Sequence, residues 1–369
     1  MVSLNTSQAM PITRLACWPR LAASFGRTIN CSERCYPRSI AAVSFSYRSL
    51  FVRIVVAGSI AYDYIMVFPG QFKDHILADK VHVLSVSFLV ESMKRMRGGT
   101  GPNIAYNLAL LGERPTVMGT VGEDFSEYRT WLENAGVDTG LIKVIEGDFT
   151  ASCFINTDLS DNQITAFYPG AMAQAHRQRL PLDGHRPDFV IIAPNDPAAM
   201  AQLVIECQTN NIPYLYDPSM QAPRMNGPEL LAGCRSAAAL IGNDYEFAMM
   251  AEKIGCTEEE LHQVVGLTVV TKGGEGATIY QNGQVYEIPA AKPTIVADPT
   301  GAGDAFRAGF VRGYLAGLPM PVTGRIASLT ACYAIEHHGT QEHRHTKAEF
   351  MARYEENFGA EPLLAELFG

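Results

Sequence analysis

Short apolar runs alternate with segments of helical character along most of the chain after residue 53. These runs are rich in Val, Ile, Leu and Ala, which is typical of strands buried on both faces. The predicted strands are Ile54–Ala57, Thr116–Gly119, Phe189–Ala193, Tyr214–Tyr216, Ala239–Ile241 and Thr268–Thr271. The predicted helices are Asn103–Leu111, Glu127–Asn134, Pro197–Thr209, Glu229–Cys234, Asp244–Ile254 and Glu258–Val265. Such alternation predicts a mostly parallel sheet covered by helices on both faces.

Two stretches, about 64–97 and 148–170, break this alternation because they mix polar and apolar residues without a helical period. Within the second, Thr150–Thr157 and Gln163–Tyr168 read as strands that are separated by the turn-like Asp158–Asn162. We expect the two stretches to form a small β lid beside the main sheet.

The first 52 residues differ from the rest in composition. Residues 1–53 hold seven Arg, no Lys and a single acid, Glu33, so their formal charge is +6, whereas residues 54–369 sum to −15. This leader is interpreted as an organellar transit peptide, a disordered tail, or upstream DNA translated in error with the true start near Val52. Each interpretation places it outside the fold and leaves residues 53–369 as one domain.

The net charge of −9 argues against nucleic acid as the main partner. No apolar run approaches the roughly 18 residues that a membrane span needs. The eight cysteines form no CxxC pair, so neither a zinc site nor a disulfide framework is indicated. They are expected to be buried thiols in a reducing compartment, the cytoplasm.

The strongest chemical signal is the run Asp298-Pro-Thr-Gly-Ala-Gly-Asp304-Ala-Phe306. Thr294–Ala297 before it looks like a strand end, and Phe306–Leu315 after it has a helical pattern, so the glycines would lie at a helix N-terminus. Backbone N–H groups and the helix dipole favour an anion there. Asp304 could then accept a proton from a hydroxyl that attacks a phosphate.

Other interpretations of this run remain. It could be an ordinary cap and turn. It half resembles a dinucleotide fingerprint, with Phe306 in place of the third glycine, and no GxxxxGK(S/T) loop occurs in the chain.

The run resembles the C-terminal signature of the PfkB (ribokinase-like) family of carbohydrate and nucleoside kinases. Arg97–Ala105 (RGGTGPNIA) is similar to that family's N-terminal signature, Asn243–Glu246 to its Asn-x-x-Glu element, and Thr271–Gly276 to its nucleotide loop. The motifs lie in the family's order within residues 54–345. The resemblance implies a ribokinase-like three-layer α/β sandwich with a β lid, and phosphoryl transfer from ATP with Mg²⁺.

The resemblance also implies roles on the ATP side. Asp304 would be the base, and the amides of Gly301, Ala302 and Gly303 would form an anion hole. Asn243 and Glu246 would organise Mg²⁺ through water, although the same pair could be a helix capping box. The nucleotide phosphates would contact Thr271 and Gly273, Gly276 would admit the nucleotide, and Asp298 is the local acid for a monovalent cation such as K⁺.

On the acceptor side, Asp63 follows the first strand, where ligands bind in open α/β sheets. By resemblance it would bind a sugar diol, with help from Gly98, Gly99 and Asn103. Several stretches look similar to the bacterial adenosine-kinase branch, and Phe167, Tyr168 and Met172 could supply a slot for the base or simply pack the lid. The function expected is phosphorylation of adenosine at the 5′-hydroxyl.

Alternatives stay open at this point. Met220 stands where that branch is expected to have a glutamine, which leaves another nucleoside or a plain sugar as the acceptor. A silent ligand-binding protein and an NAD-dependent dehydrogenase are the rivals from other classes. The lid edge could pair in a homodimer. His337, His338, His343 and His345 either border the nucleotide or bind a metal.

Overall fold

The computed structural model describes residues 52–76, 82–83, 85–160 and 162–368. The interpretations of the leader concern residues 1–51, which lie outside the described residues, and they stay predictions. None of the helices within the described ranges has the length and apolar character that a membrane span requires.

A nine-stranded sheet forms the centre of the fold, with strand order β13-β12-β11-β10-β9-β8-β1-β4-β5. The run from β5 to β11 is parallel, and β12 and β13 then continue the sheet in antiparallel fashion. The mostly parallel sheet is therefore confirmed. The strand bounds are β1 Ile54–Ala57, β4 Thr116–Val121, β5 Asp138–Val144, β8 Phe189–Ile192, β9 Tyr214–Tyr216, β10 Ala239–Asn243, β11 Leu267–Thr271, β12 Ala277–Gln281 and β13 Gln284–Ile288.

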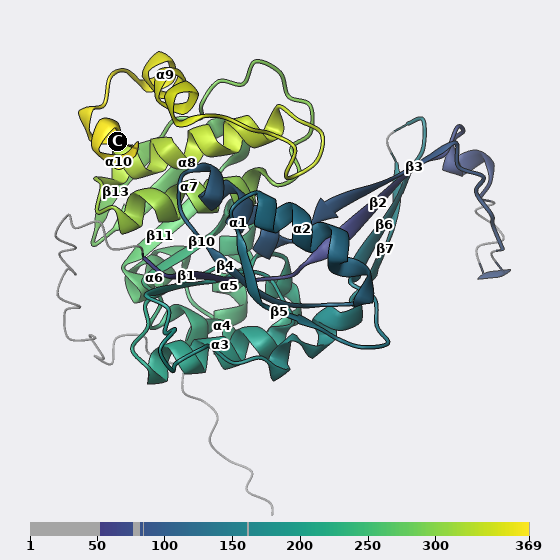
Figure 1. Ribbon diagram of the computed structural model, residues 1–369, viewed down its shortest axis with the longest axis horizontal. Helices are drawn as coiled ribbons and strands as arrows, with labels where there is room; N and C mark the ends of the chain where they lie inside the picture. The colour runs from purple at the N-terminus through teal and green to yellow at the C-terminus, as the bar shows by residue number, and fades with distance from the viewer. Residues whose placement is uncertain (1–51, 77–81, 84, 161, 369) are drawn as a thin grey trace, which may run out of the picture. The chain divides into compact units, whose positions relative to one another are not determined.

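Helices cover both faces of this sheet, as the alternation predicted (Figure 1). Strand β1 shows why its sequence is apolar throughout: Ile54 and Val56 join one core cluster, whereas Val55 and Ala57 join the other. The first face carries α1 Thr100–Leu110, α2 Ser126–Asn134, α7 Ala302–Leu315 and α8 Met320–Ile335. The second carries α3 Pro197–Thr209, α4 Gly227–Cys234, α5 Asp244–Ile254 and α6 Glu258–Val265.

Shorter elements complete the fold. Helices α9 Lys347–Phe358 and α10 Pro362–Phe368 pack with α8 in a third core cluster. The 3₁₀ segments are η1 Phe72–Asp74, η3 Glu123–Phe125, η4 Gly170–Arg177, η5 Ser219–Arg224 and η6 Gly273–Glu275.

The expected lid is a separate four-stranded sheet of order β3-β2-β6-β7, and it stands to one side of the large sheet in Figure 1. Its strands are β2 Ala61–Val67, β3 Ser92–Gly98, β6 Ala151–Thr157 and β7 Gln163–Tyr168. Strand pairing places Met96, Asp63, Cys153 and Phe167 side by side in one row across this sheet. Because paired residues point to the same face, these side chains share one surface of the lid.

The prediction of a strand end at Thr294–Ala297 is wrong, because these residues form an irregular loop. The loop satisfies its backbone against the end of α8 rather than against a strand. Ala297 and Asp298 donate their N–H groups to the carbonyl of Ile335, and Thr294 donates to Glu336. Ile295 and Val296, the β-branched pair that suggested a strand, are largely exposed.

Helices α7 and α8 pack closely through small residues. A Cβ atom at Gly309 would lie 2.6 Å from the Cα of Ala327 and 2.7 Å from the Oγ1 of Thr330, too close for real atoms. In an exposed helix, Gly→Ala gains up to about 1 kcal/mol of helix propensity. Here the steric clash between the two helices decides the sign.

We therefore expect Gly309→Ala to lower the free energy of unfolding by about 1–3 kcal/mol, because the two helices must separate to admit the methyl group. Gly274→Ala is the matched control, since a Cβ there meets open space, and it should change stability by less than about 0.5 kcal/mol. Denaturant unfolding followed by circular dichroism compares the two variants. Equal midpoints would contradict the close packing of α7 on α8.

Candidate active site

Helix α7 begins at the glycine-rich run that the sequence singled out. Gly301 caps the helix with φ +81°, a left-handed conformation that glycine adopts without strain. A Cβ at this position would also lie 2.8 Å from the Cγ2 of Thr340. Of the expected anion-hole amides, that of Ala302 donates to the carbonyl of Pro299 at 3.2 Å, so it would have to exchange this bond for a phosphate oxygen.

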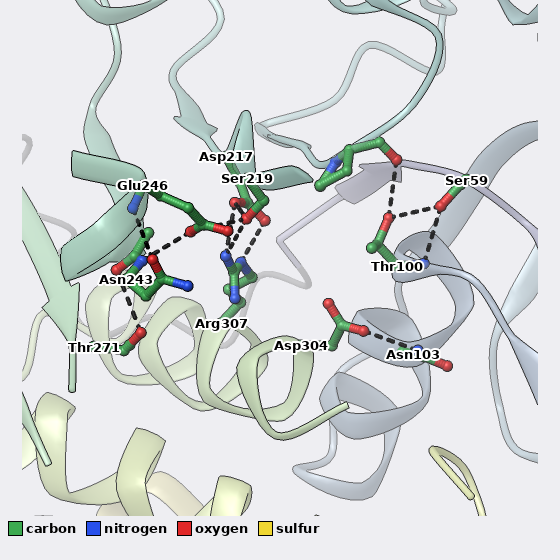
Figure 2. Close-up of polar contacts among 12 residues, drawn as sticks. Ser59, Thr100, Asn103, Asp217, Ser219, Asn243, Glu246, Thr271, Asp304 and Arg307 are labelled. Atoms are coloured by element: carbon green, nitrogen blue, oxygen red, sulfur yellow. Dashed lines mark hydrogen bonds and ion pairs between the residues drawn. The ribbon is translucent and has the colours of Figure 1, made fainter. Parts of the chain in front are cut away.

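Asp304 lies in the first turn of α7 and is partly buried. The side-chain N–H of Asn103, on α1, donates to its Oδ2 at 2.8 Å (Figure 2). Burial raises the pKa of Asp304 to about 6, against the opposing effects of the Arg307 charge and of this hydrogen bond. A carboxylate with such a pKa is ionised near pH 7 and is basic enough to accept a proton.

One helical turn after Asp304, Arg307 forms a buried ion pair with Asp217. Its Nε and Nη2 donate to the two carboxylate oxygens of Asp217, the second at 2.8 Å, and Nη2 also donates to the Oγ of Ser219 at 2.6 Å. The two charged side chains are 8% and 1% exposed. The sequence analysis gave Arg307 no role, although a charged residue inside the apolar run Ala305–Phe310 is a signal, because a buried charge requires a partner.

Asn243 and Glu246 form a reciprocal capping box at the start of α5. Each side chain accepts a backbone N–H of the other at 2.8 Å, so the capping interpretation is confirmed. The Glu246 carboxylate also lies 3.4 Å from the Oγ of Ser219, which connects it to the Arg307 ion pair (Figure 2). Burial raises the pKa of Glu246, with partial compensation from the Asn243 N–H. A carboxylate that is short of compensating charge suits a hydrated Mg²⁺ ion, so the donor set fits this metal.

The nucleotide loop follows β11. The Thr271 hydroxyl donates to the carbonyl of Gly242 at 3.3 Å, and Gly273 and Gly276 both have positive φ, +56° and +94°. A Cβ at Gly276 would lie 2.0 Å from the carbonyl oxygen of Ile288, whereas one at Gly273 meets nothing within 4 Å. In this structure glycine is required at 276 by the close approach of β13.

The acceptor-side residues lie where the lid meets the main sheet. Asp63 is on β2, and a Cβ at Gly98 would lie 2.5 Å from its Oδ2, so glycine leaves room for this carboxylate. Burial, and then the charge of Asp298, raise the pKa of Asp63 to about 6. Gly99 has φ +92° and precedes α1, which carries Asn103.

Of the residues proposed for the base slot, Phe167 and Tyr168 on β7 are 50% and 46% exposed. Met172 is buried in a cluster with Ala61 and Ala151. The packing interpretation therefore describes Met172, whereas Phe167 shares the lid face of Asp63.

A cleft with a volume of 590 Å³ separates the lid from the loop after α8. Asp298 lies in it and accepts the N–H of Gly339 at 3.2 Å. Burial alone would raise the pKa of Asp298, but hydrogen bonds from Thr300 and Gly339 and the charge of His338 bring it below its usual value. The lining comprises Ile65, Lys94, Arg95, Met96, Arg97, Asp298, His338, Gly339 and Glu342.

The C-terminal histidines do not assemble into a metal site within the described residues. His343 is fully buried, and its Nε2 lies 2.8 Å from the Oδ1 of Asn107, while the ring of His345 packs at a tilted angle against that of Tyr333. Burial lowers the pKa of His343 to about 3 and that of His345 to about 4. Both imidazoles are neutral parts of the core around neutral pH.

Comparisons with known proteins agree on one family. The model of the pfkB family of carbohydrate kinases matches residues 55–347. A nucleoside kinase of Methanothermobacter thermautotrophicus is 30% identical, over 84% of this chain and 97% of its own length. The structure of Burkholderia thailandensis nucleoside kinase in complex with inosine is 37% identical, with a TM-score of 0.75 over 84% of this chain and 99% of that chain.

Adenosine kinases are represented by the Sinorhizobium meliloti structure. It is 19% identical with a TM-score of 0.61, over 79% of this chain and 96% of that chain, which shows the fold alone. The kinases most similar to this chain in these comparisons are named nucleoside kinases, so the particular resemblance to the adenosine-kinase branch stays a prediction.

The buried histidines predict a pH dependence of stability. A histidine has a pKa of about 6.5 in an unfolded chain. Below that pH the unfolded state therefore binds protons at His343 and His345, whereas the native state does not. Stability is then complete above about pH 6.5 and is lost as the pH falls toward 4 and 3.

Between pH 6 and pH 5 the free energy of unfolding of the wild type should decrease. We expect this decrease to be about 1 kcal/mol smaller in His343→Gln, which keeps a partner for Asn107. Chemical denaturation at each pH measures this slope. His185→Gln is the control, because His185 is exposed and should leave the slope unchanged. If both variants keep the wild-type slope, His343 titrates normally in the folded protein.

Proposed function

The chain belongs to the pfkB family of carbohydrate kinases and is a phosphotransferase that uses ATP, and we propose that it phosphorylates the 5′-hydroxyl of a nucleoside. Adenosine is the acceptor that the sequence resemblance favours. The similarity to nucleoside kinases over nearly the full length of those proteins supports a nucleoside in general. A solved relative has ADP and inosine bound, which makes inosine the second acceptor to test.

The observation that carries the proposal is the position of Asp304. Its carboxylate lies at the N-terminal end of a helix that begins with a left-handed glycine, where an anion is favoured. A negative side chain beside a phosphate repels it, so a carboxylate at this position is a costly choice. A chemical role for the carboxylate would explain why it is there. The raised pKa and the single oriented hydrogen bond from Asn103 fit a general base.

In the proposed reaction the acceptor hydroxyl gives its proton to Asp304 as its oxygen attacks the γ-phosphorus of ATP. The bond between that phosphorus and the bridging oxygen of ADP breaks, and ADP leaves with the electron pair. The amides of Gly301 and Gly303, and that of Ala302 once it has left the carbonyl of Pro299, would stabilise the charge on the transferring group. The charge of the buried Arg307 guanidinium opposes the effect of burial on the pKa of Asp304 and of Glu246.

Magnesium would be held through water by Glu246, next to Asn243, and would neutralise phosphate charge during transfer. Thr271 and Gly273 would lie along the nucleotide phosphates, and Gly276 shapes the same loop. Asp298, whose pKa is lowered, is the proposed ligand for a monovalent cation such as K⁺.

For the acceptor, Asp63 would receive hydrogen bonds from the two ribose hydroxyls, with backbone groups at Gly98 and Gly99 beside it. Asn103 already uses one N–H for Asp304, and its Oδ1 accepts from Thr340 and Gln341, so one N–H is left for the sugar. Phe167 lies on the same lid face as Asp63 and would contact the base.

We propose the cytoplasm as the location, because Cys207, Cys234 and Cys332 are buried thiols. The lid strands β3 and β7 are edges of their sheet, and pairing of such edges would support a homodimer.

A substrate panel with MgATP tests the proposed function. Purified protein is assayed by coupled ADP release with adenosine, inosine, cytidine, ribose and fructose as acceptors. We expect the kcat/KM for at least one purine nucleoside to exceed that for either free sugar by about 100-fold or more, since a sugar lacks the base contacts. Preference for a sugar would assign the chain to the sugar-kinase alternative, and turnover of none would refute the proposal.

Replacement of the base tests the assignment of Asp304. Asp304→Asn removes the proton acceptor with little change in shape, so kcat should fall by about 100-fold or more, while the Kd for ADP changes by less than about threefold. Isothermal titration calorimetry gives the Kd. Asp183→Asn, at an exposed loop position, should leave both quantities unchanged. Turnover that survives in Asp304→Asn at the wild-type rate would remove Asp304 from the chemistry.

A further inference from the structure

A chain of buried side chains connects the end of the lid strand β3 to Asp304. We propose that Tyr128 and Gln341 are positioning residues, which couple Gly98, the last residue of the lid strand β3, to the orientation of the Asn103 amide and so to Asp304. We call this path the relay. This inference rests on the proposed function, because it assumes that Asp304 acts as the base. Neither residue contacts the reacting atoms.

The contacts form a continuous path. The hydroxyl of Tyr128, on α2, donates to the carbonyl of Gly98 at 3.0 Å. The side-chain N–H₂ of Gln341 donates both to the Tyr128 hydroxyl oxygen and, at 2.9 Å, to the Oδ1 of Asn103. Asn103 then donates to the Oδ2 of Asp304 at 2.8 Å. The side chains of Tyr128, Gln341 and Asn103 are at most 4% exposed, so water competes little for these bonds.

The direction of every bond in this path follows from its first member. A backbone carbonyl can only accept, so the Tyr128 hydroxyl must donate its proton to Gly98. The Tyr128 oxygen is then left as an acceptor, and Gln341 must turn its N–H₂ group toward it. The second N–H of that group requires the carbonyl oxygen of Asn103, which leaves the Asn103 N–H₂ group for Asp304. Burial raises the pKa of Tyr128 well above its usual value, so the hydroxyl keeps its proton.

A second contact joins the same two regions. The Oγ1 of Thr340 lies 3.1 Å from the carbonyl of Arg97, next to Gly98, and 2.7 Å from the Oδ1 of Asn103. The Thr340 methyl group also packs against Gly301 at the start of α7. The segment 340–341 therefore contacts the end of β3, the N-cap Gly301 of α7, and the side-chain amide of Asn103 that donates to Asp304.

The consequence for catalysis is that the position of the lid determines which group of Asn103 faces Asp304. With the Gly98 carbonyl in place, Asp304 receives an N–H. If that carbonyl moves away, the Tyr128 hydroxyl is free to rotate and the Gln341 amide loses the constraint on its orientation. The Oδ1 of Asn103 then keeps only its contact with Thr340. Asp304 would then face either N–H₂ or a carbonyl oxygen, and a carbonyl oxygen disfavours the ionised form.

A purely structural role for these side chains makes a different prediction. Loss of a buried hydroxyl would lower the Tm, but the titration of a carboxylate several bonds away would stay the same. The relay predicts that the acidity of Asp304 changes even though its own neighbours are intact. The pH dependence therefore separates the two roles.

The variants are Tyr128→Phe, which removes only the hydroxyl, and Gln341→Met, which keeps the length of the side chain. Tyr214→Phe is the matched control, because the Tyr214 hydroxyl is also buried and donates to a glycine carbonyl, that of Gly233, at 2.8 Å on the other face of the sheet. The kinetic constants of all variants and of the wild type are measured with the acceptor that the substrate panel identifies. Each should lower the Tm by a similar few degrees.

For Tyr128→Phe and Gln341→Met we expect kcat to fall about 3–10-fold, the worth of one oriented hydrogen bond, with the KM for ATP within twofold of wild type. Asp304 and Asp63 both have a pKa of about 6 and both contribute to the acid limb of the kcat/KM profile. The contribution of Asp304 should move up by about half a pH unit or more, while that of Asp63 should stay in place. The double variant should be no worse than the poorer single variant, because both break one path. Tyr214→Phe should keep wild-type kinetics.

A direct titration keeps this test independent of turnover. The ¹³C shift of the Asp304 carboxyl, assigned by its loss in Asp304→Asn, is followed against pH in the free protein. An upward shift of the midpoint in Tyr128→Phe supports the relay even if the panel finds no nucleoside activity, in which case the proposed function alone fails. An unchanged midpoint together with an unchanged acid limb, at a Tm as low as that of Tyr214→Phe, would overturn the relay.

Discussion

The site depends on the cost of keeping the Asp304 carboxylate charged in a partly buried place. Burial pushes its pKa up, while the Arg307 guanidinium and the Asn103 amide pull it down, and the balance lies close to neutrality. Either influence alone would be unsuitable for catalysis: without burial the carboxylate would be a weak base, and without its partners it would be protonated and inert. The elements around Asp304 hold its two partners, Arg307 and Asn103, in place.

Helix α7 and its N-cap bring most of these groups together within about two turns. The N-cap Gly301 is left-handed, Asp304 follows three residues later, and Arg307 lies one turn further on. Arg307 there binds Asp217, which follows β9, and through Ser219 it approaches Glu246 on α5. The helix is held against α8 by Gly309 and Gly313, which admit no side chain. Sequence spacing within one helix therefore sets the distance between Asp304, the proposed base, and the Arg307 guanidinium, and close helix packing prevents that distance from relaxing.

Much of this could be predicted from the sequence, because the signals were local. Strands β1, β8 and β9 are visible in the sequence as apolar runs. A glycine-rich run before a helical pattern likewise indicates a turn that needs the left-handed conformation. The strand predicted at Thr294–Ala297 failed because Ile295 and Val296 resemble strand residues, whereas the end of α8, distant in sequence, supplies the hydrogen bonds of that loop. The sequence analysis assigned Gln341 no role of its own for the same reason, because its side-chain contacts are with residues more than 200 positions away. Long-range hydrogen bonds leave no periodic trace.

At Glu246 the first of two explanations that the sequence presented as rivals is confirmed, and it is compatible with the second, which stays a proposal. One carboxylate oxygen, Oε2, completes the capping box with Asn243, and this bond alone accounts for a glutamate at the third position of α5. A cap on a solvent-exposed helix would leave the pKa of the carboxyl near or below its usual value, because the N–H and the helix dipole both favour the charged form. Here burial raises it nevertheless, and the carboxylate is close to the Asp217–Arg307 pair. The cap fixes the direction in which the side chain points. The Asn243 N–H and the Arg307 charge compensate only part of the cost of burial, and the proposed hydrated Mg²⁺ would offset the rest.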